Sequence, residues 1–212
     1  MMNCSSKEAK KTGRYILTAA CVAALGLMVG VRAARAADVI TPPNVPENLQ
    51  VPEGNEIFRV GHGVGFQNYV CAPFSSALGH VAYTLFTPQA TLFDAGEQLT
   101  SHFFSPNPFE GGTVRATWQD SVDSSRVWAR ANASSVDPKF VAPGAVAWVL
   151  LQTVGTDLGP TGGSTLAATT FIQRVNTVGG VAPSTGCDSI TDVGTKAFMP
   201  YTADYIFYRR RN

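Results

Sequence analysis

Glycine and proline recur at short intervals along most of this chain, and the runs between them are rich in β-branched and aromatic residues. After residue 55, no run repeats its apolar residues with the 3.6-residue period of an amphipathic helix over more than two turns. The runs instead have the length and composition of β-strands, at residues 64–71, 81–86, 90–93, 98–104, 113–119, 126–131, 145–154, 165–175 and 205–209. The pattern predicts one all-β domain, either an antiparallel β-sandwich or a barrel-like fold with long loops.

Three segments carry more specific predictions. Residues 94–97 read Asp-Ala-Gly-Glu and predict a hairpin turn. Residues 145–154 are nearly all apolar and are bounded by glycine and proline, which favours a strand buried on both faces. Residues 105–112, SPNPFEGG, predict an exposed loop.

The first 36 residues have the layout of a secretory signal peptide. A basic region precedes an apolar run at 15–31, and Ala34-Arg35-Ala36 supplies an A-x-A cleavage signal. The apolar run is shorter than the roughly 20 residues of a membrane span, and a lipoprotein site at Cys21 is disfavoured because no Leu-led motif precedes it. We predict a signal peptide at 1–36 cleaved after Ala36, an extended Pro-rich segment at 37–55 and a β-rich domain at 56–212. The mature chain is then periplasmic or secreted, with no transmembrane anchor.

Cleavage changes the charge of the chain. It removes six of the 16 Lys and Arg residues and one of the 15 Asp and Glu residues, so the net charge moves from +1 to −4. Three of the remaining cations form the terminal run at 209–211. A domain that binds nucleic acid usually presents a basic face, so this balance disfavours a nucleic-acid partner.

The cysteines form a simple pattern once the signal peptide is removed. Cys4 and Cys21 leave with it, so Cys71 and Cys187 remain as a pair in an oxidising compartment. We predict a disulfide between them. Closing so long a loop restricts the unfolded chain by about 4–5 kcal/mol in the entropy model.

The stretch GHGVGFQNYVC at 61–71 invites a phosphate-loop interpretation, which its spacing does not support. A dinucleotide loop needs G-x-G-x-x-G between a strand and a helix, whereas Gly61, Gly63 and Gly65 alternate and lead into a strand. The glycines therefore predict a bulge or a close backbone approach. We expect no cofactor.

Four motifs carry a resemblance to a known family, namely GVGFQNYVC (63–71), PQATLFDAGEQLTSHF (88–103), FIQRVNTVGGVAPSTGC (171–187) and MPYTADYIFY (199–208). In this order they resemble a family of secreted bacterial and fungal proteins that is catalogued only as a domain of unknown function. The resemblance implies export and a shared β-rich domain, and it implies no activity. The chain departs from the family pattern by an insertion at 104–115 and by Tyr83, where the family often has Trp.

The histidines and carboxylates give no strong catalytic pattern. His62, His80 and His102 show no metal-ligand spacing, so no metal site is expected. His102 lies at a strand end within a family motif, either as a structural histidine or as an acid–base group. Four aspartates lie in turn-like contexts where their side chains commonly close the turn, namely Asp120, Asp123, Asp137 and Asp157. No G-x-S-x-G motif is present, although a triad of residues distant in sequence is not excluded.

A polar stripe at 173–177 is the most informative feature for function. Gln173 and Arg174 are adjacent, so on a strand they point to opposite faces. A buried Arg174 needs a partner, and Asp204 or Asp188 is the expected one. The stripe is either a structural brace near the disulfide or the floor of a pocket, for which Tyr69, Trp118, Tyr201 and Tyr205 offer flat surfaces. The residues predicted to bind a ligand are Gln67, Tyr69, His102, Trp118, Gln173, Arg174, Asn176 and Tyr201.

These observations favour an exported binding or interaction module in the cell envelope or outside the cell. Its partner is an unknown small molecule, a glycan or an envelope protein. The first alternative is a secreted hydrolase-like enzyme, with His102 as the acid–base group and Arg174 as the anion contact. The second is a structural envelope protein with no small ligand.

Overall fold

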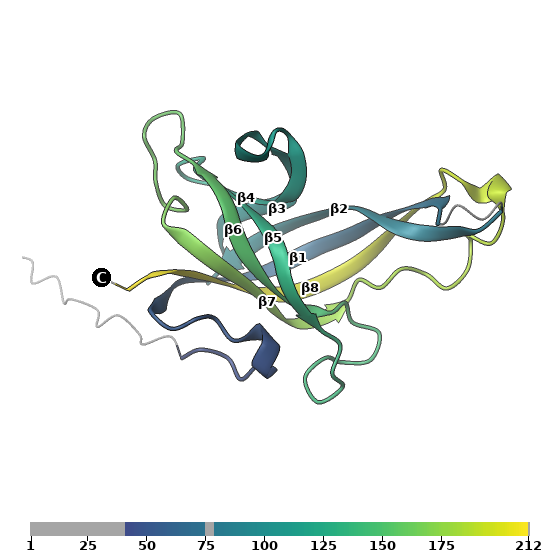
Figure 1. Ribbon diagram of the computed structural model, residues 1–212, viewed down its shortest axis with the longest axis horizontal. Coiled ribbons are helices and arrows are strands. Elements are labelled where there is room, and N and C mark those ends of the chain that lie inside the picture. The colour runs from purple at the N-terminus through teal and green to yellow at the C-terminus, as the bar shows by residue number, and fades with distance from the viewer. Residues whose placement is uncertain (1–40, 75–78, 212) are drawn as a thin grey trace, which may run out of the picture. The chain divides into compact units, whose positions relative to one another are not determined.

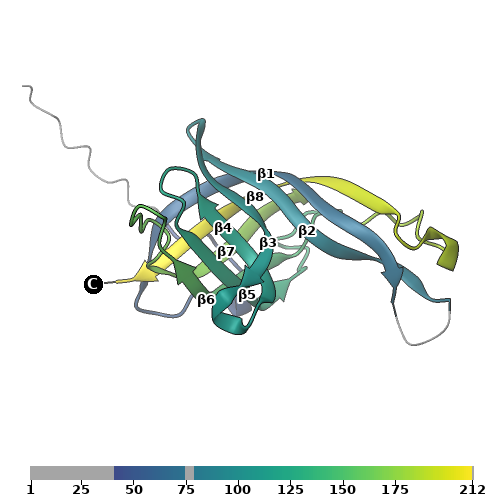
Figure 2. The ribbon, with the colours of Figure 1, turned by 90° about the horizontal axis from the view of Figure 1, so that it is seen from above.

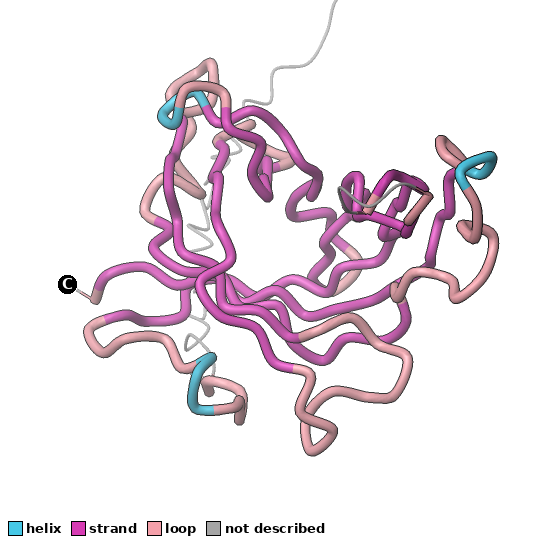
Figure 3. The backbone as a smooth tube through the Cα atoms, turned by 45° about the vertical axis from the view of Figure 1, so that its right-hand side comes forward, coloured by secondary structure: helices cyan, strands magenta, loops and turns pink. Residues whose placement is uncertain are grey.

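The chain folds into a closed barrel of eight antiparallel strands, in which each strand pairs with the next and β8 closes on β1. The structure, a computed structural model, describes residues 41–74 and 79–211, so the predicted signal peptide lies outside the described residues. Figures 1 and 3 show the strands curling round to meet. The strands are β1 (Asn55–Pro73), β2 (Val81–Asp94), β3 (Glu97–Asn107), β4 (Thr113–Asp120), β5 (Arg126–Ser135), β6 (Trp148–Asp157), β7 (Thr169–Gly179) and β8 (Lys196–Arg210).

The all-β prediction is confirmed, and the barrel is the form it takes. Short 3-10 turns are the helical elements of the described residues, η1 (Glu47–Leu49), η2 (Pro108–Glu110) and η3 (Ile190–Asp192). No helix in this part of the chain has the length and apolar character needed to cross a membrane.

Several predicted boundaries were wrong. The segments at 81–86 and 90–93 are one strand that runs through Pro88, and β8 begins nine residues before the predicted residue 205. The predicted loop at 105–112 is partly strand and partly η2, and Asn107 within it is fully buried. These stretches have weak strand composition, and they are held by pairing with β1 or β4 rather than by local preference.

The predicted turn at 94–97 is confirmed. Asp94 pairs with Glu97 across it, while Ala95 and Gly96 both have positive φ, 46° and 88°. Positive φ at both central residues is the geometry of the tight hairpin turn that matches strand twist.

Three strands extend beyond the barrel as an arm. β2 pairs with β3 only from Ala90 onward, and β8 pairs with β7 only from Tyr201 onward, so the remaining parts of β1, β2 and β8 pair with one another alone. Figures 1 and 2 show this arm projecting from the barrel. The predicted disulfide is confirmed here. Cys71 on β1 joins Cys187 in the loop before β8, with the Cα atoms 5.5 Å apart.

The glycines of β1 serve close backbone approach. A Cβ on Gly65 would lie 2.1 Å from the carbonyl oxygen of Gln89 on β2, and one on Gly63 would lie 2.8 Å from the ring of Tyr205. The Tyr205 ring therefore packs directly against the backbone of β1 at Gly63, where any side chain would clash with it.

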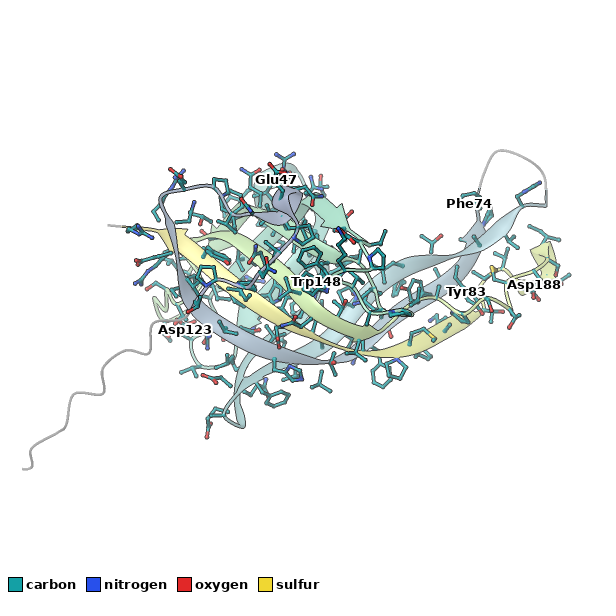
Figure 4. The ribbon with its side chains drawn as sticks, turned by 90° about the horizontal axis from the view of Figure 1, so that it is seen from below. Glu47, Phe74, Tyr83, Asp123, Trp148 and Asp188 are labelled. Carbon is teal, nitrogen blue, oxygen red and sulfur yellow. A yellow bond between two sulfur atoms is a disulfide. The ribbon has the colours of Figure 1, made fainter. Side chains whose placement is uncertain are left out.

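The barrel has two apolar cores on opposite surfaces of the same strands. The inner core fills the barrel and includes Trp118, Leu151, Ile172, Tyr205 and Phe207. The outer core lies on the other face of β6, β7 and β8 and includes Leu49, Trp148, Leu150, Val175 and Tyr208. Residues 41–54 and the segment before β6 cover this outer face, and Figure 4 shows Glu47 and Trp148 on the same side of the barrel. The prediction that β6 is buried on both faces is confirmed by Leu150 and Leu151, which belong to different cores.

Candidate functional site

A cavity of about 250 Å³ lies within the barrel. Five of its lining side chains come from five strands, namely Gln67, His102, Trp118, Arg174 and Tyr205 on β1, β3, β4, β7 and β8. Most of the other lining residues are apolar, including Ala129, Val149 and Leu151. Leu85 and Val114 also line the cavity and are exposed, so they mark its mouth. A concave, mostly apolar space with a few convergent polar groups is the usual form of a small-molecule site.

Three aromatic rings form one side of the cavity. His102 and Trp118 are direct neighbours across β3 and β4, and their rings stack with centroids 4.1 Å apart and an interplanar angle of 8°. The Tyr205 ring lies 5.2 Å from His102 and 5.7 Å from Trp118. We call these three rings the aromatic cage. Strand pairing fixes their positions, so the cage needs no ligand to assemble.

His102 is neutral in the folded barrel. Its Nδ1 lies 2.9 Å from the carbonyl oxygen of Thr117, and because a carbonyl only accepts, Nδ1 carries the proton. Burial lowers the pKa of His102 to about 3, the Thr117 hydrogen bond opposes this, and the charge of Arg174 lowers it further. His102 therefore offers an unprotonated Nε2 beside Trp118.

Arg174 has no carboxylate partner among the described residues. Its Nη2 donates to the carbonyl oxygen of Ala147 at 2.8 Å, and its Nε has no hydrogen-bond partner. The predicted pairing with Asp204 or Asp188 was wrong. Asp204 lies on the outer side of β8, where it accepts from His62 and Asn176, and Asp188 accepts from the backbone N–H of Gly186.

Two further cavity-lining side chains carry buried donors without partners. They are Gln67, at Nε2, and Trp118, at Nε1. Buried polar groups are normally hydrogen-bonded, so unpartnered ones around a single cavity call for an explanation.

With the geometry described, comparison with known proteins adds one result. The sequence model of a family described as a protein of unknown function (DUF3455) matches residues 52–209. The chain belongs to the DUF3455 family. A search of curated proteins and a search of solved structures found no match. The predicted membership of a family catalogued as a domain of unknown function is thus confirmed, and the family's description assigns no activity to the DUF3455 domain.

The segment at 104–115, which the resemblance marked as an insertion, helps to build the cavity of this DUF3455 domain. Phe104, Val114 and Arg115 line the cavity, and Arg115 is held by two hydrogen bonds to Glu110. Hydrogen bonds from Arg115 and Asn107 lower the pKa of Glu110 to about 2, so its carboxylate stays charged. Sequence reasoning did not nominate Arg115 or the nearby Arg130, because nothing in their neighbourhood marks them as facing a cavity.

Two of the predicted tyrosines lie beside the cavity rather than in its lining. Tyr201 shares a hydrogen bond of 2.9 Å between hydroxyl oxygens with Tyr205, and burial raises the pKa of both. Tyr69 donates to the carbonyl oxygen of Gly180 at 2.7 Å, and burial raises its pKa against the opposing charge of Arg174. Tyr201 supports the cavity wall through Tyr205, which lines it.

The structure places Gln173 and Asn176 away from the cavity. Gln173 faces the outer core, where its Nε2 donates to Leu49 O at 2.7 Å and its Oε1 accepts from Tyr208 at 2.6 Å. Asn176 lies at a register shift of β7 with φ of 51°, and its side chain donates to Asp204. A regular strand would have put Asn176 on the same face as Arg174, so the bulge is what separates them.

All four aspartates were predicted to serve turns, and this is confirmed for three of them. Asp120, Asp123 and Asp137 each accept from backbone N–H groups of their own turn, whereas Asp157 pairs with Arg126. Figure 4 shows Asp123 at the end of the barrel opposite the arm. Within the described residues, no cluster of three His, Cys, Asp or Glu side chains is placed to hold a metal ion.

Proposed function

We propose that this DUF3455 domain is an exported binding module that takes a small molecule into the cavity of its barrel. The observation that carries the proposal is the convergence, around one cavity of about 250 Å³, of a preformed aromatic cage and unpartnered donors on Gln67, Trp118 and Arg174. A protein that only needed a stable barrel would be better served by apolar side chains at these positions.

Export rests on the sequence of residues 1–36 and on the disulfide. The basic, apolar and A-x-A regions have the composition and order typical of a signal peptide. The Cys71–Cys187 disulfide suits an oxidising compartment outside the cytoplasm.

The chemistry of His102 favours binding over the enzyme alternative. A group whose burial lowers its pKa to about 3 is a weak proton acceptor at neutral pH. General acid–base catalysis works best when the pKa of the catalytic group lies near the working pH. No carboxylate is among the residues that line the cavity, so His102 has no acidic partner there.

A fragment screen tests the proposal. The full chain is expressed with its own leader, purified with the disulfide intact, and screened by ¹H–¹⁵N NMR against small aromatic and aliphatic fragments. The indole N–H signal of Trp118 is expected to shift, while Trp148 in the outer core serves as an internal control. Shifts confined to Trp148, or no binding by any fragment, would favour a structural protein with no small ligand. The intact mass tests export in the same sample, because retention of residues 1–36 would contradict it.

A further inference from the structure

The cavity has an excess of hydrogen-bond donors over acceptors. Gln67 Nε2, Trp118 Nε1 and Arg174 Nε are all buried N–H donors without partners. Three backbone acceptors nearby are already occupied, since Thr117 O accepts from His102, Ala147 O from Arg174 and Gly180 O from Tyr69. The acceptors that remain are His102 Nε2 and the hydroxyl oxygens of Tyr201 and Tyr205, which lie 2.9 Å from each other and close to Gln67 and Arg174. A ligand that satisfies this wall must bring acceptors of its own.

The cavity also has an excess of positive charge. Arg115, Arg130 and Arg174 line it, and no carboxylate does. Glu110 balances Arg115 at the mouth through two hydrogen bonds, and Arg130 is exposed and hydrogen-bonded to Gln152. Arg174 is half-buried and forms no salt bridge with a described carboxylate, and its charge affects four cavity-side groups, Tyr69, His102, Tyr201 and Tyr205. Apolar walls strengthen such a field because they exclude water.

The size of the cavity and the character of its remaining wall constrain the body of the ligand. The cavity is somewhat smaller than the roughly 300–1,000 Å³ of sites for drug-sized molecules, so its occupant has few atoms. The stacked pair of His102 and Trp118 offers a flat surface, and Ala129, Val149 and Leu151 offer aliphatic contact. This environment suits an apolar or aromatic body rather than a second charged group.

From these contacts we propose that the cavity binds a small carboxylic acid as its anion, with the carboxylate at Arg174 and an apolar body in the cage. The inference rests on the proposed binding function and adds the chemical class of the ligand. A planar guanidinium matches the two oxygens of a carboxylate, and Gln67 and Trp118 supply neutral donors of the kind that complete its hydrogen bonding. Of the three lining arginines, Arg115 is paired with Glu110 and Arg130 is exposed, so Arg174 alone faces the ligand among apolar walls. One such arginine suits a carboxylate better than a phosphate, for which clusters of arginines are usual.

Three probes with the same body and different heads test this proposal: phenylacetate, phenylacetamide and phenethylamine. Each is titrated into the oxidised protein while the indole N–H signals of Trp118, Trp128 and Trp148 are followed by NMR. Phenylacetate is expected to shift Trp118 and to bind about tenfold or more tightly than the amide, because a hydrogen bond to a charged group is the stronger kind. The amine is expected not to bind. Inorganic phosphate is titrated separately.

Variants of one cavity arginine and one arginine outside the cavity provide matched controls. Arg174→Gln is expected to abolish the preference for acid over amide. Arg174→Lys is expected to lose part of that preference, because the charge stays and the planar fork is lost. Arg210→Gln, the same substitution at an exposed residue that does not line the cavity, is expected to change phenylacetate binding by less than about threefold. If Arg174→Gln fails to fold, the acid-to-amide ratio of the unaltered protein decides the question.

The outcomes separate this inference from the proposed function. Equal binding of acid and amide, or an unchanged ratio in a folded Arg174→Gln variant, would overturn the carboxylate site and leave a binding module for neutral molecules. Phosphate binding more tightly than phenylacetate would overturn the choice of head group. If no probe and no fragment shifts Trp118, both proposals are wrong and water satisfies the donors.

Discussion

Gln173 and Arg174 are neighbours on β7, yet their surroundings differ in kind. Gln173 faces the outer core, is only 2% exposed, and has both ends of its amide hydrogen-bonded to Leu49 and Tyr208. Arg174 faces the barrel interior, is half-buried, and makes one hydrogen bond to a described residue. The amide of Gln173 is fully hydrogen-bonded as the chain folds, whereas Arg174 keeps a donor without a partner. The outer core has an unpartnered donor of its own at Trp148 Nε1, so what distinguishes the inner surface is that three such donors, on Gln67, Trp118 and Arg174, line one cavity.

The largest expected effect on stability comes from removing the hydrogen bonds of Gln173 on the outer face of the barrel. Gln173→Leu leaves Leu49 O and Tyr208 Oη buried without a partner, and each such loss costs about 1–3 kcal/mol. We expect the free energy of unfolding in urea to fall by about 3 kcal/mol. Gln152→Leu, which removes a solvent-exposed contact to Arg130, should change it by less than about 0.5 kcal/mol. Equal losses from the two variants would contradict a special role for the outer face.

The second-largest expected effect is a loss of stability in acid, which comes from His102 on the inner surface of the barrel. Folding lowers the pKa of His102 from its ordinary 6.5 to about 3, so the unfolded chain binds a proton that the barrel excludes. The stability held by neutral His102 is complete above pH 6.5 and is lost as the pH falls toward 3, at about 1.4 kcal/mol per pH unit. Between pH 6.5 and 5 this amounts to about 2 kcal/mol.

Two histidine variants test whether His102 causes this dependence of stability on pH. In His102→Gln the loss between pH 6.5 and 5 should disappear, whereas in the exposed His80→Gln it should remain. Urea unfolding at several pH values measures both. A slope that persists in His102→Gln would place the responsible proton elsewhere.

The smallest expected effect is a gain in stability rather than a loss. Arg174→Met removes a half-buried charge that has no carboxylate partner, so the ligand-free protein should gain about 1 kcal/mol of stability. Arg130→Met, at an exposed position, should lie within about 0.5 kcal/mol of the unaltered protein. A clear loss of stability in Arg174→Met would mean that the bond to Ala147 O makes Arg174 a structural brace, and the contrast with Gln173 would fail.

Local pattern predicted much of the fold because strand and turn signals act over a few residues. The alternation along β1, the Asp94–Glu97 turn and the two-sided burial of β6 follow from side-chain period and turn chemistry. Barrel closure did not follow, because it depends on β1 pairing with β8, which is distant in sequence. Strand ends in the arm were missed for the same reason.

The candidate site was only partly within reach of sequence reasoning. Gln67, His102, Trp118 and Arg174 were nominated by residue type and strand context, and they line one cavity. Asn176 was placed wrongly, because a bulge with positive φ is not visible in the surrounding residues. The contribution of 104–115 to the cavity wall was also not predictable, since it depends on how that segment packs over β4 and β6.

The sequence by itself determined that the described chain is built of strands, that Cys71 and Cys187 pair, and that Gln173 and Arg174 face opposite ways. These follow from periodicity and from the chemistry of single residue types. Only the tertiary structure decided which of the two faces inward, because inside and outside exist only once the first and last strands join. The same closure leaves Arg174 without a counter-charge in an apolar cavity.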